Sequence, residues 1–167
     1  MGSSCSGKTT VAGTLAEHFG VPHVELDALH HGPNWQEATA GELRSSVETA
    51  LAAQAGWVVD GNYMGKLGAL VIDRADTIVW LDPPLRVLLA RLRRRTANRI
   101  RDRVELWSPG NFESWRSFLS WNGLLLYTVR NHHRRRREWP AEFGDRDVVR
   151  LRSQAEIDAW LRRLPRS

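Results

Sequence analysis

The first ten residues constrain this chain more strongly than any other stretch. The run Gly2-Ser3-Ser4-Cys5-Ser6-Gly7-Lys8-Thr9 fits the pattern G-x-x-x-x-G-K-[ST] at every fixed position. Its glycines allow the backbone to curl so that several N–H groups point at one phosphate, and a helix that begins near Lys8 adds the positive end of its dipole. The pattern therefore predicts a loop that binds ATP through residues 2–10, up to Thr10. Lys8 would lie on the β- and γ-phosphates and the Thr9 hydroxyl on Mg²⁺.

Chance is a poor explanation for this motif. The chain has only two lysines, one of which is Lys8, and 13 glycines, so accidental matches over its whole length amount to roughly one in a thousand. Val11, Leu15 and Phe19 then repeat every fourth residue, as in an amphipathic helix. Two alternatives account for fewer of these features: a flexible Gly/Ser terminus, and a lipidation signal M-G-x-x-x-[ST] with Cys5 as a second acyl site.

A loop of this type follows a buried strand, and here only Met1 precedes it. We therefore expect roughly five to eight further residues upstream of Met1, a strand's length and rich in Val, Ile and Leu. Without them the centre of the sheet would hold a slot, where each unpaired buried backbone group costs ~1–3 kcal/mol. Because a domain is stable by only ~5–15 kcal/mol, we expect the chain as written to be marginally stable, to aggregate, or to fill the slot with a strand from elsewhere.

Short apolar runs alternate with helical patterns along the rest of the chain. Strands are predicted at 21–26, 57–59, 77–81 and 147–151, and helices at 8–19, 40–54, 84–98, 111–137 and 154–164. Polar segments at 30–35 and 99–110 are predicted to be loops. This alternation predicts an α/β fold, in which helices cover both faces of one parallel sheet. Because no repeat or linker divides the chain, residues 1–167 are predicted to form one domain.

Composition narrows the classes of partner. A net charge of +5 and a pI of about 10.3 favour polyanions such as nucleotides or nucleic acid. The single cysteine excludes an intramolecular disulfide and suits a reducing cytosol, and no apolar run approaches the ~18 residues of a membrane span. A cytoplasmic protein without a membrane partner is therefore expected. The basic run 130–137 is the strongest nucleic-acid feature, but it lacks the interleaved aromatic residues that stack on bases, so nucleic acid is not favoured.

Five segments in series carry a family resemblance. They are the phosphate loop, Leu26-Asp27-Ala28-Leu29, Pro33-Asn34-Trp35, Trp57-Val58-Val59-Asp60-Gly61-Asn62-Tyr63 and Ala75-Asp76-Thr77-Ile78-Val79-Trp80-Leu81-Asp82. Together they span nearly the whole chain and resemble the adenylate-kinase-like P-loop proteins, most closely the branch described as DNA-topology-modulation proteins. The resemblance implies the three-layer fold of P-loop NTPases, with five parallel strands in the order 2-3-1-4-5. The first of these strands would be missing here.

In adenylate kinases, two arginines four residues apart follow the fourth strand and lie on the nucleotide. Arg91 and Arg95 have this spacing after Asp82-Pro83-Pro84 and would share one helix face. One departure argues against AMP as the acceptor, because Asn62-Tyr63-Met64 stands where those kinases carry the Pro-Arg that holds the AMP phosphate. The resemblance also implies a lid-like segment at about 96–112, whose arginines would close over the phosphates: Arg99, Arg101 and Arg103.

Two aspartates end predicted strands, which is where ligands bind in open α/β sheets. In similar small-molecule kinases an acid at this place holds the acceptor hydroxyl, so the resemblance implies this role for Asp27, which could act as a base or contact Mg²⁺ through water. Asp60 is expected to contact Mg²⁺ through water, or the acceptor. The simpler alternative for each is a turn-forming aspartate. The predicted acceptor pocket comprises Asp27, Asn34, Trp35, Asp60, Asn62 and Tyr63. The residues predicted to act on the transferring group are Lys8, Asp27, Arg91 and Arg95, although each arginine could instead belong to a solvated basic face.

Two functions of different classes follow. The first is a phosphotransferase that moves the γ-phosphoryl group of ATP·Mg²⁺ to a nucleotide or another small hydroxyl or phosphate acceptor. The second is a nucleic-acid-associated protein that binds nucleotide without transferring phosphate, and an inactive fragment that lacks its first strand is a further alternative. The predicted acceptor pocket favours the first, since a binding protein needs no such pocket. The sequence leaves the acceptor and the oligomeric state open.

Overall fold

The structure is a computed structural model that describes residues 1–52, 55–121 and 123–165. Its first half contains α1 (Lys8–Phe19), β1 (His23–Glu25), α2 (Leu26–His30), the short 3₁₀ helix η1 (Pro33–Trp35), α3 (Ala40–Ala52), β2 (Val58–Asp60) and α4 (Met64–Leu67). Its second half contains β3 (Ile78–Leu81), α5 (Leu85–Arg101), α6 (Trp115–Leu119), α7 (Leu124–Phe143), β4 (Val148–Leu151) and α8 (Gln154–Leu161). The predicted α/β composition is confirmed. None of the described helices combines the length and apolarity needed to cross a membrane.

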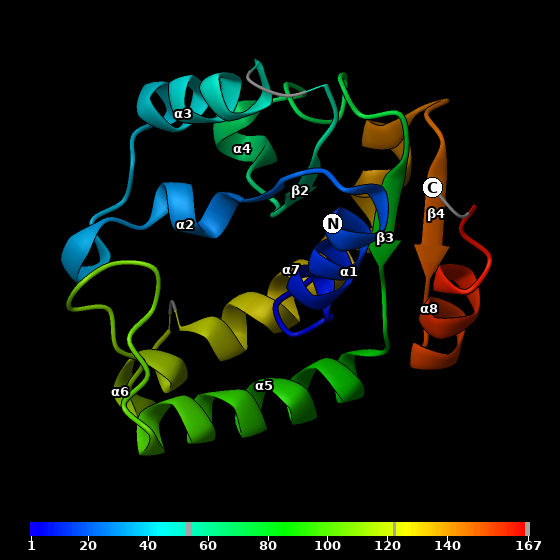
Figure 1. The fold of residues 1–167 in the computed structure, drawn as a ribbon. Coiled ribbons are helices and arrows are strands. Elements are labelled where there is room, and N and C mark those ends of the chain that lie inside the picture. Colours follow the sequence, from blue (N-terminus) through cyan, green and yellow to red (C-terminus); the bar gives the residue numbers. More distant parts are fainter. Residues whose placement is uncertain (53–54, 122, 166–167) are drawn as a thin grey trace.

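The described strands form two parallel pairs. β1 pairs with β2, with His23 opposite Val58, and β3 pairs with β4, with Ile78 opposite Val148. Within the described residues β2 and β3 are not paired with each other. Figure 1 shows β3 and β4 together at one end of the molecule, with α1 and the N-terminus between them and the helices α3 and α4. The order 2-3-1-4-5 therefore stays a prediction.

Helix α1 has the bounds that the sequence predicted. Gly20 ends it in a left-handed conformation (φ 62°), and its N–H donates to the carbonyls of Ala16 and Glu17. Buried Val11 and Leu15 turn one face of α1 toward β3 and β4, where they pack with Leu81, Leu151 and Ile157 of α8. A second apolar cluster joins α2, α3 and α4 through Leu26, Leu43, Val47, Leu51 and Leu67. The packing of α1 in this core therefore fixes the position of the loop that precedes the helix.

The predicted strand 21–26 is too long. β1 ends at Glu25, and Leu26 begins the short helix α2. Leu26 is buried directly against the chain after β2, where a Cβ on Gly61 would lie 2.6 Å from the Leu26 Cβ. The helical turn therefore packs Leu26 on Gly61. This contact joins segments that are distant in the sequence, so the local pattern of apolar residues could not predict it. Asp27 consequently lies in the first turn of α2 rather than on a strand.

The single helix predicted at 111–137 is wrong. Ser114 begins α6 with a capping box to Ser117, and a separate helix, α7, begins after Gly123. α7 then continues through Pro140 to Phe143, because Trp139 and Phe143 pack on Trp80 of β3 at ring-centroid distances of 5.5 and 5.9 Å. Smaller errors concern helix ends: α5 extends to Arg101 and α8 stops at Leu161, while the predicted end of the 40–54 helix lies outside the described residues.

Asp82 connects three elements just beyond β3. Its carboxylate is buried and accepts hydrogen bonds from Arg136 Nε of α7 at 2.8 Å and from Arg150 Nη2 of β4 at 2.6 Å. The Arg150 guanidinium also lies 3.9 Å from the centre of the Trp80 ring. A carboxylate buried to this degree needs such cationic partners. Asp82 therefore holds α7 against the end of the β3–β4 pair.

We expect Asp82→Asn to destabilise the fold by about 2 kcal/mol, since two charge-assisted hydrogen bonds lose the ionised acceptor. Urea denaturation of the variant and the wild type would measure this change. Asp145→Asn removes a carboxylate that is exposed after α7 and should change the free energy of unfolding by less than about 0.5 kcal/mol. Equal effects of the two substitutions would contradict the structural role of Asp82.

Candidate functional site

The loop before α1 has the backbone geometry that glycines permit. Gly2, Cys5 and Gly7 all have positive φ angles (156°, 62° and 97°), and Ser6 N donates to Ser3 O at 3.0 Å. A Cβ on Gly2 would lie 2.8 Å from Leu81 O, so this position requires glycine. Left-handed residues inside a turn allow successive N–H groups to point to one side, which suits an anion. Burial raises the pKa of the Cys5 thiol, which favours its protonated form, although Arg95 and Arg99 oppose this effect.

Asn62 attaches this loop to the end of β2. Its Oδ1 accepts a hydrogen bond from Gly2 N at 3.0 Å, and its Nδ2 donates to Gly2 O. The amide therefore satisfies both backbone groups of Gly2 at once. Asn62 was predicted to bind an acceptor, and the structure places it on the cavity wall but occupied with holding the loop.

A buried carboxylate lies beneath the start of α1. Asp60 is 2 % exposed, and its Oδ2 accepts the Thr9 hydroxyl at 2.5 Å. Lys8 Nζ is 3.5 Å from Asp60 Oδ1 and 3.8 Å from Asp27 Oδ2. Within the described residues Asp60 Oδ1 has no hydrogen-bond partner. The ammonium thus lies between two carboxylates, and Asp60 divides its oxygens between the Thr9 hydroxyl and the Lys8 ion pair.

Tyr63 orients the second carboxylate. Its hydroxyl donates to Asp27 Oδ1 at 2.7 Å and lies 3.4 Å from His31 Nε2. Burial, followed by the charge of Asp27, raises the pKa of the Tyr63 phenol, so the hydroxyl stays protonated and can serve as this donor. Asp27 is left with Oδ2 directed toward Lys8. The two oxygens of one carboxylate therefore have different partners.

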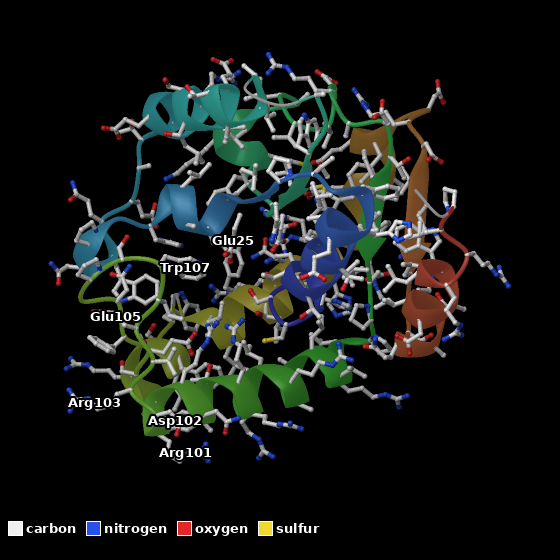
Figure 2. The ribbon with its side chains drawn as sticks, in the orientation of Figure 1. Glu25, Arg101, Asp102, Arg103, Glu105 and Trp107 are labelled. Atoms are coloured by element: carbon white, nitrogen blue, oxygen red, sulfur yellow. The ribbon has the colours of Figure 1, made fainter. Side chains whose placement is uncertain are left out.

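Two loops meet over this pair and form an aromatic wall. The His31 and Trp107 rings stack at a centroid distance of 5.3 Å, and Trp35 meets His31 edge-on at 5.4 Å. Figure 2 shows Trp107 and Glu25 facing the interior space between α2 and the side of α5. Trp35 and Trp107 both adopt left-handed conformations, with φ angles of 59° and 54°. Such strain in bulky residues requires support from neighbouring structure.

Asn111 supplies much of that support. This fully buried amide accepts Trp35 N through Oδ1 at 2.5 Å and donates to Gly32 O at 3.1 Å. Asn34 N also donates to Pro109 O at 3.0 Å, and Ser108 Oγ donates to His31 O at 2.9 Å. The 31–35 loop and the 106–112 loop are consequently joined into one arch. The sequence had presented them as two separate polar loops.

One face of α5 carries arginines toward the loop. Arg91 Nη1 is 3.5 Å from Ser6 O, while Arg95 and Arg99 pair with Glu113 Oε1 at 3.5 and 2.7 Å. The predicted shared face of Arg91 and Arg95 is confirmed, and Arg99 extends it. The other two arginines of the predicted lid-like segment, Arg101 and Arg103, do not line the cavity, and their closure over phosphates stays a prediction. Figure 2 shows Arg101 and Arg103 at the outer edge of the molecule, where Arg101 pairs with Asp102.

Arg135 is a candidate functional residue that the sequence analysis did not predict. It is 7 % exposed, and its Nη1 lies 3.4 Å from Ser3 Oγ of the loop while Nη2 donates to the Tyr127 hydroxyl at 3.1 Å. Burial lowers the pKa of this guanidinium. Arg135 belongs to the basic run 130–137, in which helix position alone decides which arginines turn inward. Arg135 lies four residues after Asn131 and four before Trp139, both of which are buried, so this helical spacing could have indicated that Arg135 shares their inward face.

Most of these groups border one cavity of about 880 Å³. The predicted residues that line it are Ser4, Cys5, Gly7, Lys8, Thr9, Thr10, Asp27, Trp35, Asn62, Tyr63, Arg91 and Arg95. Gly2, Ser3, Ser6 and Asp60 lie behind this lining and support it. Arg99, expected as a lid arginine, also lines it, and the cavity residues that sequence reasoning missed are Glu25, His30, His31, Glu37, Leu106, Trp107, Glu113, Leu124, Tyr127 and Arg135. In the part of the chain that the structure describes, no three His, Cys, Asp or Glu side chains gather as metal ligands.

No protein-family model and no curated protein matches this chain.

Gly110 is the position where the arch is most sensitive to substitution. Its φ of 84° disfavours any side chain, and a Cβ there would lie 3.0 Å from Asn34 Cγ. We expect Gly110→Ala to cost ~1–3 kcal/mol and to change the near-UV circular dichroism of the tryptophans. Gly41→Ala in α3, where an added Cβ meets open space, should instead be neutral or stabilise by ~0.5 kcal/mol. Unchanged tryptophan dichroism in Gly110→Ala would argue against the arch.

Proposed function

We propose that this chain is an ATP·Mg²⁺-dependent phosphotransferase that acts on a hydroxyl or phosphate group of a small acceptor. One observation supports this proposal most: Lys8 Nζ lies 3.5 Å from Asp60 and 3.8 Å from Asp27 at the rim of a glycine-shaped loop. A group for the phosphates, a group for the metal and a group for the acceptor therefore occupy one cavity. This is the set that phosphoryl transfer requires, because its catalysis depends on positioning and charge neutralisation.

The donor half of the site consists of the loop, Lys8, Thr9 and Asp60. Oxygen ligands suit Mg²⁺, and the Thr9 hydroxyl lines the cavity with the Asp60 carboxylate directly behind it, so Thr9 could bind the ion and Asp60 could support it through water. When bound, Mg²⁺ would neutralise charge on the β- and γ-phosphates. Lys8 would then leave its carboxylate partners and bind the phosphate oxygens. Arg91 and Arg135, each within 3.5 Å of a loop oxygen, would add positive charge on either side.

The acceptor half depends on Asp27. The acceptor hydroxyl would donate its hydrogen bond to an Asp27 oxygen while the Tyr63 hydroxyl holds the carboxylate in place. As the acceptor oxygen bonds to the γ-phosphorus, the bond from that phosphorus to the β–γ bridging oxygen breaks, and ADP leaves. The proton of the acceptor hydroxyl passes to Asp27. Trp35, Trp107 and His31 close this end of the cavity and would exclude water that competes as acceptor.

The nucleic-acid alternative receives less support. It rested on the basic run 130–137, whose inner members have partners inside the fold: Arg135 contacts Ser3, and Arg136 binds Asp82. These guanidinium groups are directed into the molecule and are not presented as one outer surface for a phosphate backbone. Two arginines of the run are therefore committed to contacts within the fold, and Arg130, Arg134 and Arg137 are left exposed.

Lys8→Ala should abolish detectable ATP·Mg²⁺ binding in a calorimetric titration, a loss of at least tenfold in affinity, because the lysine supplies the charge opposite the β- and γ-phosphates. Lys66→Ala is the matched control, since Lys66 is the chain's other lysine and bonds to Glu37 and Ala38 away from the loop. The control should keep wild-type affinity for ATP. Equal affinity of Lys8→Ala and the wild type would overturn the proposal.

Asp27→Asn should lower kcat by at least a hundredfold and leave ATP affinity nearly unchanged, since general-base catalysis typically contributes 10²–10⁴-fold. The acceptor would first be identified by ADP release from a panel of nucleosides, nucleotides and sugars. Tyr63→Phe removes only the hydroxyl that orients Asp27, so its loss of kcat should be smaller. An Asp27→Asn enzyme with wild-type turnover would show that Asp27 is merely a structural residue of α2.

A further inference from the structure

The charged residues of the phosphate cavity divide between its two walls. Its arginines all come from α5 and α7, namely Arg91, Arg95, Arg99 and Arg135. Three of its four carboxylates come instead from the end of β1, from α2 and from the loop that follows: Glu25, Asp27 and Glu37. Figure 1 shows α2 and α5 facing each other across the molecule. One wall of the cavity is therefore basic and the other acidic.

The basic wall has no spare charge for a second phosphate-bearing molecule. Among the described residues that line the cavity, two arginines pair with Glu113 at 3.5 and 2.7 Å, and the other two lie within 3.5 Å of oxygens of the phosphate loop. In the proposed reaction Lys8 also binds the phosphates of ATP. An acceptor that carried its own phosphate would therefore have to separate Glu113 from its arginines.

The acidic wall, in contrast, lacks positive charge. Glu25 is half-buried and faces the interior (Figure 2), and among the described residues its carboxylate has no hydrogen bond or ion pair. Asp27 has Lys8 at 3.8 Å and loses this partner when the lysine moves to the phosphates. His30 does not replace it, because burial and then the charge of Lys66 lower the pKa of that imidazole. Two carboxylates then need a cation that the acceptor itself could supply.

Aromatic rings adjoin these carboxylates. Trp35 and Trp107 line the same cavity and are 38 and 37 % exposed, so part of each ring stays accessible to a ligand. The Tyr63 ring also borders the cavity and bonds to Asp27 through its hydroxyl. The face of an aromatic ring attracts a cation, and so does a carboxylate. The two kinds of group together fit a protonated amine and disfavour a phosphate.

We propose that the acceptor is a small amino alcohol, such as an amino sugar, which places its hydroxyl on Asp27 and its ammonium between Glu25 and the rings of Trp35 and Trp107. This assignment rests on the proposed phosphotransferase function and names the substrate class of the same site. The cavity of about 880 Å³ must also hold the phosphates of ATP, so a single sugar ring or a smaller molecule suits the remaining space.

The chemistry of the transfer selects the hydroxyl of such an acceptor. A protonated amine has no lone pair, so the hydroxyl oxygen is the atom that bonds to the γ-phosphorus. The bond from that phosphorus to the β–γ bridging oxygen breaks, ADP leaves, and the proton of the hydroxyl passes to Asp27. The ammonium keeps its charge throughout and serves only to position the acceptor.

Matched acceptors test this assignment by their rates of ADP release at saturating ATP·Mg²⁺. The probes are glucosamine, galactosamine and ethanolamine, each compared with its N-acetyl derivative, which keeps the hydroxyl groups and removes the charge. AMP represents acceptors that carry a phosphate. We expect kcat/KM for at least one amine to exceed that of its N-acetyl derivative by roughly tenfold or more, because the derivative loses the ion pair and the cation–π contact. AMP should give no release above the background with ATP alone.

Glu25→Gln tests the position of the ammonium. We expect this variant to raise the KM for the preferred amine by roughly tenfold, and to change neither the KM for the N-acetyl derivative nor the affinity for ATP·Mg²⁺. Glu142→Gln is the matched control, since Glu142 is exposed on α7 and does not line the cavity. It should match the wild type in every measurement. Weaker ATP·Mg²⁺ binding by Glu25→Gln would mean that Glu25 serves the metal, and the assignment would be wrong.

Two results with the acceptors would also contradict the assignment. One is a rate with AMP or with the N-acetyl compounds that equals the rate with the amines. The other is that no amine raises ADP release above the background. Either result can occur while ATP·Mg²⁺ binding still requires Lys8, so the assignment can fail although the proposed nucleotide site stands. Failure of the proposed function would instead appear as equal ATP affinity of the wild type and Lys8→Ala.

Discussion

The buried carboxylate of Asp60 is the group on which the site depends. An ionised carboxylate with 2 % exposure is costly unless donors or cations surround it, and here the Thr9 hydroxyl and the Lys8 ammonium take that role. This interaction fastens the first turn of α1 to the end of β2. It also places the loop before α1 at the carboxyl ends of the strands, where open α/β structures bind ligands.

Positive charge in this chain is divided between structure and site. Asp82 binds Arg136 and Arg150, and Glu113 binds Arg95 and Arg99, so these guanidinium groups are held in fixed positions. Arg135 has no such carboxylate among its described contacts and is held by hydroxyl groups instead. A buried guanidinium without a counter-ion suits an anionic ligand better than an empty site, because the ligand would supply the missing charge. This physical reason supports the proposal that the cavity binds a phosphate-bearing ligand.

The acceptor end of the cavity is built differently, from neutral aromatic rings and backbone contacts between two loops. Strained Trp35 and Trp107 keep their conformations because Asn111 binds the first loop and the backbone of Pro109 binds Asn34. An arch of this kind is stiff, since several hydrogen bonds must break together before it opens. The cavity therefore joins a charged half, which would neutralise phosphate in the proposed reaction, to an aromatic half that would limit the entry of water.

The sequence by itself determined the features that local chemistry controls. The motif from Gly2 to Thr9, the helix that ends at Gly20, and the spacing of Arg91 and Arg95 follow from glycine conformation and helical period, so each was predictable. Tertiary structure decided the rest: the helix that begins at Leu26, the division of the 111–137 segment, and the inward turn of Arg135. These features depend on which distant residues are buried together, and that burial has no local pattern. Gly61 leaves space for the Leu26 side chain. Packing of Trp139 on Trp80 stabilises α7 on both sides of Pro140, so the helix continues through this proline.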